Sequence, residues 1–405
     1  MGGGLLQLVA YGAQDVYLTG NPQITFFKVV YRRHTNFAIE AIQQTFNGNP
    51  AFGQRVTSTI ARSGDLINRA YLVVNTAGLT GNLCNYFGLR LINYVEVEIG
   101  GQKIDKHYSH WMYIWNELSL PSSKQQGWYE MVGGAGGAAG KTYYVPLEFW
   151  FCRNVGLALP LIGLQYHEVK INLLFEDAAA CVQDSTAIAG TFDASLWVDY
   201  IYLDTDERRK FAQASHEYLI EQLQFTGKEA AQSKIKLNFN HPCKEIVWVA
   251  TKQSYTTTAE SNNNWFNYTT NPAVDASGAT NYASMSEALK NNTIASPNPI
   301  AKGKLILNGN DRFSERTGSY FNLVQPFQHH ENVPSNAGIN VYSFALKPEE
   351  HQPSGTLNMS RIDTSTLDLT YKTGVTASTH DMNIYAVNYN VLRILSGMGG
   401  IAYSN

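Results

Sequence analysis

Residues 94–101 read YVEVEIGG, and this stretch predicts a β-strand that ends in a tight turn. Val95, Val97 and Ile99 alternate with tyrosine and glutamate, so the apolar side chains share one face of an extended chain. Gly100 and Gly101 are typical of a two-residue hairpin turn. The stretch therefore indicates antiparallel sheet at this point of the chain.

Short runs of the same kind recur on both sides of this strand, bounded by Gly, Pro, Asn and Ser. They cover residues 69–74, 169–175, 196–203, 235–239, 245–250, 304–307, 341–346, 366–371 and 383–389. Few segments have helical periodicity, and the best of them, 107–118 and 285–289, are short. Many short strands with few helices predict a β-sandwich or barrel rather than a fold of alternating strands and helices.

The strand pattern is also repeated along the chain. The phrase FNG at 46–48 leads to strands at 55–60 and 71–74, and the phrase FTG at 225–227 leads to strands at 234–239 and 246–249. Strand 95–99 runs into Gly100 and Gly101, as strand 305–307 runs into Asn308 and Gly309. Matched points lie about 180 to 210 residues apart, roughly half of the 405-residue chain. We therefore expect two copies of one β-fold with about eight strands each.

Composition narrows the classes of protein to consider. Charged residues make up 16% of the chain, below the usual quarter, and the formal net charge is −3. A surface with few charges favours association, and the lack of a basic stripe argues against nucleic-acid binding. The four cysteines, at 84, 152, 181 and 243, have no metal or redox spacing. We expect a soluble, cytoplasmically made protein with free thiols, no signal peptide and no membrane span.

Candidate chemical sites are weak. The glycine-rich run at 133–140 lacks the strand before it and the helix after it that a phosphate-binding loop needs. His107 and His110 could share a helix face as metal ligands, but no third ligand stands at a matching offset, and the pair at 329–330 is a weaker case. Neither a His-Glu-x-x-His motif nor a Gly-x-Ser-x-Gly elbow occurs. We therefore expect no enzyme activity, cofactor or metal.

The two copies differ in their loops, at 122–141, 251–299 and 323–340. The longest, 251–299, is rich in Asn, Thr, Ser and Ala, and a loop of this length is usually functional or mobile. It contains glycosylation sequons at Asn267 and Asn291, which we expect to be accessible and treat as candidate glycosylation sites. A third sequon, at Asn358, borders a strand and is expected to be less accessible.

Several longer runs are spread from end to end of the chain. They are LLQLVAYGAQDVYLTGNPQITFFKVVYRRHTNFAIE at 5–40, EIGGQKIDKHY at 98–108, GLALPLIGLQYHEVK at 156–170, VDYIYLDTDERRKFA at 198–212, HEYLIEQLQFTG at 216–227, LNGNDRF at 307–313, YSFALKPEEHQPSGTLNMSRID at 342–363 and NYNVLRILSGMGG at 388–400. Together and in this order they resemble the major capsid proteins of nucleocytoplasmic large DNA viruses, most closely the algal chlorovirus type.

The resemblance implies an all-β double jelly roll, that is, two tandem eight-stranded jelly-roll sandwiches with short helices in the loops. It places an N-terminal arm at 1–25, the first jelly roll at 26–212, a linker at 213–224 and the second jelly roll at 225–405. It also implies a structural protein that forms homotrimers of pseudo-hexagonal outline. These capsomers would tile the icosahedral shell of a virion, with loop 251–299 on the outside.

Partners and location follow from the same resemblance. Trimers would contact one another, minor capsid proteins and penton proteins, and the N-terminal arm would lie near an internal viral membrane. Direct nucleic-acid binding is not expected. The protein would be made late, assembled in the host cytoplasm and retained in the virion capsid.

Other functions remain open at this point. A jelly-roll carbohydrate-binding or attachment protein could stack sugars on Trp265, Phe266 and Tyr268. A minor capsid protein of the same virion would share the fold. A β-sandwich glycoside hydrolase would need two carboxylates in a cleft, for which the sequence offers no candidates.

Overall fold

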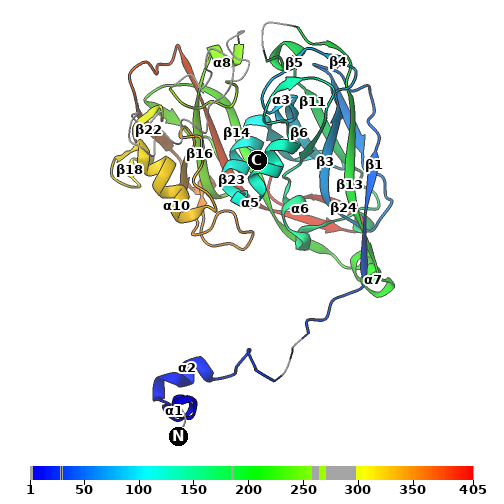
Figure 1. Ribbon diagram of the computed structural model, residues 1–405, viewed down its shortest axis with the longest axis vertical. Helices are drawn as coiled ribbons and strands as arrows, with labels where there is room; N and C mark the ends of the chain where they lie inside the picture. Colours follow the sequence, from blue (N-terminus) through cyan, green and yellow to red (C-terminus); the bar gives the residue numbers. More distant parts are fainter. Residues whose placement is uncertain are drawn as a thin grey trace. The chain divides into compact units, whose positions relative to one another are not determined.

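The computed structural model describes residues 3–27, 29, 31–183, 187–257, 264–270 and 298–404, and the chain forms two compact units, Met1–Phe37 and Ala38–Asn405 (Figure 1). The predicted helix at 285–289 lies outside the described residues. In the first unit the chain forms three short helices, α1 Gly3–Val9, η1 Ala13–Asp15 and α2 Val16–Thr19. None of these helices contains a buried residue.

The first half of the second unit is built from two antiparallel sheets. Sheet I has the order β1-β13-β3-β10, with β9 also paired to β3, and its strands are β1 Phe37–Gln44, β3 Leu66–Asn75, β9 Thr142–Pro146, β10 Leu159–Pro160 and β13 Asp193–Leu203. Sheet II has the order β2-β11-β6-β7, and its strands are β2 Arg55–Thr59, β6 Ile92–Ile99, β7 Gln102–Tyr108 and β11 Val169–Phe175. Two small ribbons join β4 Leu79–Thr80 to β12 Ala189–Gly190 and β5 Asn82–Leu83 to β8 Gly137–Ala138.

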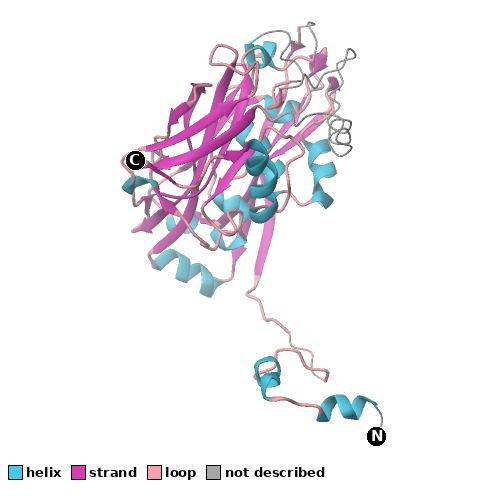
Figure 2. Cartoon of the chain, turned by 90° about the vertical axis from the view of Figure 1, so that its left-hand side faces the viewer, coloured by secondary structure: helices cyan, strands magenta, loops and turns pink. Residues whose placement is uncertain are grey.

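The second half repeats this arrangement. Sheet III has the order β14-β23-β16-β20, and its strands are β14 His216–Ala230, β16 Pro242–Lys252, β20 Asn340–Ser343, β21 Leu357–Asn358, β23 His380–Leu395 and β24 Met398–Ile401. Sheet IV has the order β15-β22-β17-β18, and its strands are β15 Lys234–Lys236, β17 Ile300–Leu307, β18 Asn310–Asp311, β19 Arg316–Thr317 and β22 Ser365–Tyr371. Figure 2 shows the long strands running beside one another, with short helices around them.

The two halves correspond strand by strand in chain order. Strands β1, β2, β3, β6 and β7 of the first half match β14, β15, β16, β17 and β18 of the second. The short strands β9 and β10 both pair with β3, as β20 and β21 both pair with β16. Strands β11 and β13 match β22 and β23. This topology confirms the predicted repeat and the double jelly roll.

Matching turns have matching chemistry. The hairpin between β6 and β7 turns through Gly100 and Gly101, with φ of 57° and 86°. The hairpin between β17 and β18 turns through Asn308 and Gly309, with φ of 48° and 81°. Two successive residues of positive φ form the turn that suits the twist of a two-residue hairpin, and Gly and Asn are the residues that adopt this conformation most readily. The predicted strand 94–99 and its turn are confirmed.

Helices occupy the connections between strands. In the first half they are α3 Phe87–Arg90, α4 Ser109–Ser119, α5 Ser122–Met131, α6 Trp150–Arg153, η2 Val155–Leu157, η3 Leu161–Gly163 and η4 Ala178–Ala180. The remaining ones are α7 Thr205–Gln213, α8 Ser254–Thr257, η6 Tyr320–Val324, α10 Gln325–His329 and η7 Met359–Arg361. Helix α4 confirms the predicted helix at 107–118. Helix α5 lies in the predicted loop 122–141, where Gly127 and a mostly polar composition obscure the helical pattern.

Sheet III is buried on both faces and joins the two halves. Alternate residues of β16 belong to different cores, because Val247 and Val249 pack with the first half whereas Ile246 and Trp248 pack with the second. Successive residues of a strand point to opposite faces, so a strand that is apolar throughout indicates burial on both sides. One face of sheet III therefore packs in the core of the first half and the other face in the core of the second half.

The structure corrects the predicted linker. Residues 213–224 were expected to connect the halves, but 216–224 lie inside β14 and pair with β23. The segment reads HEYLIEQLQ, in which Ile220 and Leu223 support a strand, while the charged run before it suggested a connector. The connection itself is α7, capped by the Asp204 side chain, which accepts from the Thr205 backbone N–H. The other domain boundaries stay predictions.

Candidate assembly surfaces

Helix α4 forms the centre of the contact between the halves. Its sequence, SHWMYIWNELS, is buried over nearly its whole length, and the buried residues include the polar Ser109, His110 and Asn116. The indole of Trp111 lies 5.4 Å, centre to centre, from the ring of Tyr385 on β23. Tyr385 in turn stacks on Phe225 of β14 at 4.8 Å. An aromatic cluster thus attaches the helix of the first half to sheet III of the second.

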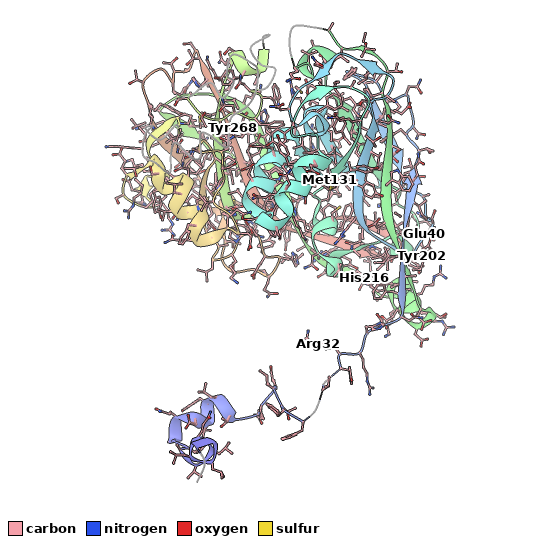
Figure 3. All side chains as sticks on the ribbon, in the orientation of Figure 1. Arg32, Glu40, Met131, Tyr202, His216 and Tyr268 are labelled. Carbon is pink, nitrogen blue, oxygen red and sulfur yellow. The ribbon has the colours of Figure 1, made fainter. Side chains whose placement is uncertain are left out.

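The described part of the predicted outer loop also lies in this contact. Trp265, Phe266 and Tyr268 pack against residues of the first half: the Arg90 guanidinium lies 3.1 Å from the centre of the Trp265 ring, and Phe266 stacks on Tyr113 at 4.8 Å. Figure 3 marks Tyr268, whose hydroxyl lies 2.8 Å from Nδ1 of His110. The prediction that these aromatics are exposed for sugar stacking is wrong, because packing between the halves buries Phe266 and Tyr268 and leaves Trp265 only partly accessible.

His107, near the end of β7, and His110, in the first turn of α4, have separate partners. His107 Nε2 lies 2.9 Å from Asp105, and its ring stacks on Phe149 at 4.8 Å. His110 contacts Tyr268 and stacks on Trp265 at 4.8 Å, and burial moves the pKa of His110 well below its usual value. Each imidazole therefore serves the packing between sheets and halves. Among the residues that the structure describes, no group of three or more metal-ligating side chains forms.

A buried ionic cluster crosses the same contact. Glu221 of β14 binds Lys244 of β16 at 2.9 Å and Arg153 of α6 at 3.1 Å, and His351 lies 3.5 Å away. Burial alone raises the pKa of Glu221, but His351, Lys244 and Arg153 outweigh it and lower this pKa to about 2. A buried carboxylate with three basic neighbours stays charged, and it holds α6 of the first half against the second.

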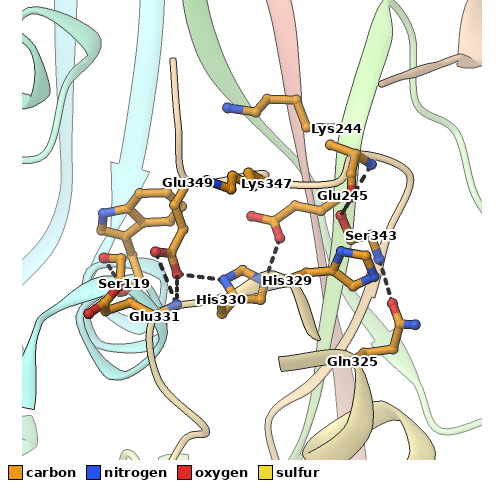
Figure 4. A network of polar contacts seen from close by, with 12 residues as sticks. Ser119, Lys244, Glu245, Gln325, His329, His330, Glu331, Ser343, Lys347 and Glu349 are labelled. Atoms are coloured by element: carbon orange, nitrogen blue, oxygen red, sulfur yellow. Dashed lines mark hydrogen bonds and ion pairs between the residues drawn. The ribbon is translucent and has the colours of Figure 1, made fainter. Parts of the chain in front are cut away.

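A second buried network surrounds His330, at the end of α10 (Figure 4). Its Nδ1 donates a hydrogen bond of 2.7 Å to Glu349, whose oxygens also accept from the backbone N–H of Glu331. Its Nε2 faces Glu245 of β16. The network thereby fixes the 344–350 segment and α10 to sheet III. Sequence reasoning missed both networks, although the charged pair Lys244-Glu245 inside an apolar strand was a signal.

The candidate glycosylation sites differ from expectation. Asn267 is 1% exposed, and its Oδ1 accepts hydrogen bonds from the N–H and hydroxyl of Thr269. The predicted accessibility of Asn267 is therefore wrong for the folded chain. Asn291 lies outside the described residues. Asn358, expected to be the less accessible one, is exposed on β21.

Exposed large apolar side chains cluster in two stretches of the described chain. In the unit Met1–Phe37 they are Leu5, Leu6, Leu8, Val9, Tyr11, Val16, Tyr17, Leu18, Ile24, Phe26, Phe27, Val29, Tyr31 and Phe37. In the second half, η6 and α10 expose Leu323, Val324 and Phe327. Exposed apolar surface of this extent marks interaction sites. No helix among the described residues is long and apolar enough to cross a membrane.

Comparisons with known proteins agree with this architecture. Residues 25–204 match the family "Major capsid protein N-terminus", and residues 207–400 match the family "Large eukaryotic DNA virus major capsid protein". The chain is 53% identical to the major capsid protein of Pyramimonas orientalis virus and 48% identical to that of Paramecium bursaria Chlorella virus 1, with 100% of each chain covered in both cases.

Solved structures extend the comparison. The PBCV-1 VP54 crystal structure fitted into a reconstruction of the virophage Sputnik superposes with a TM-score of 0.80 at 44% identity, over 94% of this chain and 100% of that one. The Faustovirus major capsid protein, at 14% identity and a TM-score of 0.74 over 95% of this chain and 94% of that one, shares the fold.

Proposed function

The chain belongs to the family of large eukaryotic DNA virus major capsid proteins, and from that membership we propose that it forms homotrimeric, pseudo-hexagonal capsomers that tile an icosahedral shell. It is a structural component of the virion capsid, and its family is not one of enzymes. The formation of the trimer and that of its lattice are the parts of this proposal that an experiment has to test.

The observation that carries the proposal is the strand-by-strand correspondence of the two halves. Three chains with two similar barrels each present six similar sides around a three-fold axis. Units of hexagonal outline cover a plane without gaps. Contacts around such an axis are heterologous and are closed by rotation. Within the trimer we expect large, apolar interfaces, and between trimers smaller and more polar ones.

The N-terminal unit supports a second part of the proposal. Its exposed apolar side chains suit contacts with neighbouring capsid proteins, including minor capsid and penton proteins, at an inner face that lies near the internal viral membrane. Assembly in the host cytoplasm, late synthesis and glycan attachment at Asn267 or Asn291 belong to the same proposal. A glycan on Asn267 would have to be added before residues 264–270 pack between the halves.

The decisive experiment is the solution mass of the purified protein by light scattering after size exclusion. A species near three times 45.0 kDa that resists dilution is expected. A monomer at all concentrations would overturn the self-assembling capsomer. Copy number in purified virions then separates a major capsid protein, with many copies, from a minor one of the same fold.

A further inference from the structure

The repeat gives each surface of the first half a counterpart in the second. Helix α4 follows β7 at the end of sheet II, and η6 and α10 follow β18 and β19 at the end of sheet IV. Sheet I of the first half corresponds to sheet III of the second. A contact between α4 and sheet III within one chain therefore has a possible equivalent between α10 and sheet I.

Within the chain, the first of these contacts is complete. Trp111 of α4 meets Tyr385 of sheet III, and Trp115, four residues later, packs against Trp111 at 5.9 Å and under the guanidinium of Arg153. Arg153 is itself paired with Glu221 of sheet III. The contact thus uses large side chains spaced i and i+4 on one helix, set against the outer face of a sheet.

In the second half, η6 and α10 also carry large apolar side chains at positions i and i+4, but these side chains are exposed. Leu323 and Phe327 are also four residues apart, and Phe327 is 79% exposed. Val324 lies beside them, and Leu346 is brought next to the helix because its carbonyl lies 3.0 Å from Nδ1 of His329. The buried side of the same helical turns is formed by Phe321, Asn322, Gln325 and Pro326. An apolar face is therefore presented outward by a helix that is anchored on its other side.

Sheet I presents a complementary surface. Its outward side carries Tyr71, Val73, Trp197, Tyr144 and Ile39, and the rings of Tyr71 and Trp197 stack in register at 6.4 Å with an interplanar angle of 9°. Tyr144 is 44% exposed and Ile39 is 53% exposed. Figure 1 shows α10 on one side of this unit and β1, β3 and β13 on the opposite side. Two different surfaces on opposite sides of a molecule suit a head-to-tail ring.

We propose that the apolar face of η6 and α10 in one copy docks on the outer face of sheet I in a second copy, so that the contact between chains repeats the α4–sheet III contact within the chain. This inference rests on the proposed trimer and assigns its interface. Three such contacts close a ring. In this ring α4 covers sheet III of its own chain, and α10 covers sheet I of the next chain.

The first test substitutes Phe327→Asp, with Tyr166→Asp as the matched control, because Tyr166 is 75% exposed and lies on neither surface. Light scattering should show loss of the species near three times 45.0 kDa for Phe327→Asp only, with the circular dichroism spectrum of the folded protein retained. A trimeric Phe327→Asp, or equal dissociation of both variants, would overturn the assignment. A monomeric wild-type protein would overturn the trimer itself, and the inference with it.

A second test uses chemical cross-linking, which detects the contact directly and does not require a variant that prevents assembly. The double variant Phe327→Cys with Tyr144→Cys is treated with a bismaleimide and run on a denaturing gel. Bands of two and three chains are expected for the double variant, and single chains for either single variant, since the contact joins unlike surfaces. The control pairs Phe327→Cys with Tyr166→Cys. A trimeric double variant that gives no more cross-linked chains than the control pair would contradict the docking.

Discussion

The imidazole Nε2 of His330 lies 2.9 Å from a carboxylate oxygen of Glu245, and both side chains are fully buried. Glu349 accepts a hydrogen bond from the other ring nitrogen. Burial alone lowers the pKa of His330, but the two carboxylates outweigh it and raise this pKa to about 9. His330 is therefore an imidazolium between two carboxylates at neutral pH. Its contact with Glu245 holds α10 against sheet III.

This arrangement predicts a loss of stability at alkaline pH. The folded-state pKa is raised above its usual 6.5, so the stabilisation is fully present below pH 6.5 and is lost as pH rises towards 9. The change should be on the order of 3 kcal/mol in the free energy of unfolding, measured by denaturant titration at several pH values. The variant His330→Gln should be less stable and should lose this pH dependence. His329→Gln, beside it but partly exposed, should keep it; an identical alkaline slope in His330→Gln would contradict the assignment.

Acid stability should depend on Glu221. Its pKa is lowered to about 2, so its contribution is present above the usual 4.5 and is lost only as pH falls towards 2. Glu221→Gln leaves Lys244 buried without its carboxylate and should cost about 3–5 kcal/mol at pH 7. The control is Glu217→Gln on the same strand, where the pair with Arg393 is exposed and contributes about 0–1 kcal/mol. Equal losses in the two variants would show that burial of Lys244 does not govern the cost.

Because both cores pack on sheet III, we expect the two halves to unfold together. Trp111→Ala removes the side chain that joins α4 to Tyr385, and it should cost about 3–5 kcal/mol. Tyr166→Ala at an exposed site should change the free energy of unfolding by about 0.5 kcal/mol at most. Calorimetry should show one transition for the wild-type protein. Two well-separated transitions, with only one shifted by Trp111→Ala, would mean that the halves are independent.

The native thiols should react slowly. Burial raises the pKa of Cys84 and of Cys152 to about 12, and it also raises the pKa of Cys181 well above its usual value. The thiolate is the reacting form, so a disulfide reagent at pH 8 should label these cysteines only after denaturation. A cysteine introduced at exposed Ser123 should react at once and serves as the control. Rapid labelling of all native thiols would contradict the burial.

Two of the sequon asparagines provide a matched pair. The Oδ1 atoms of Asn267 and Asn358 each accept from the backbone N–H two residues ahead, Thr269 and Ser360, but only Asn267 is buried. Asn267→Ala should cost about 1–3 kcal/mol because it leaves buried donors without an acceptor. Asn358→Ala should cost much less in the same unfolding assay. Equal costs in the two variants would contradict the native burial of Asn267.

Local patterns were sufficient for many of the strands, although not for β1 or β14. The alternation at 94–99 became β6, the run at 169–175 became β11, and the matching turns at 100–101 and 308–309 revealed the repeat. These features depend on neighbours a few residues apart, so they can be read along the chain. The linker at 213–224 was mistaken because a charged helix, α7, directly precedes the edge strand β14.

Two copies of one β-fold could thus be predicted from the chain alone, because strand alternation, turn residues and a repeated order are local properties of a sequence. The family and the double jelly roll were implied by the resemblance of longer runs to known capsid proteins. The aromatics at 265–268, the Glu221 cluster and the His330 network could not, because their partners come from positions far away, as His110 does for Tyr268. Exposure could not be predicted either: Asn267 and Phe327 both stand in stretches predicted to be loops, yet packing between the halves buries Asn267, whereas Phe327 is exposed on α10. Which side chains remain on the surface for another copy to cover is settled only when the two halves fold against each other.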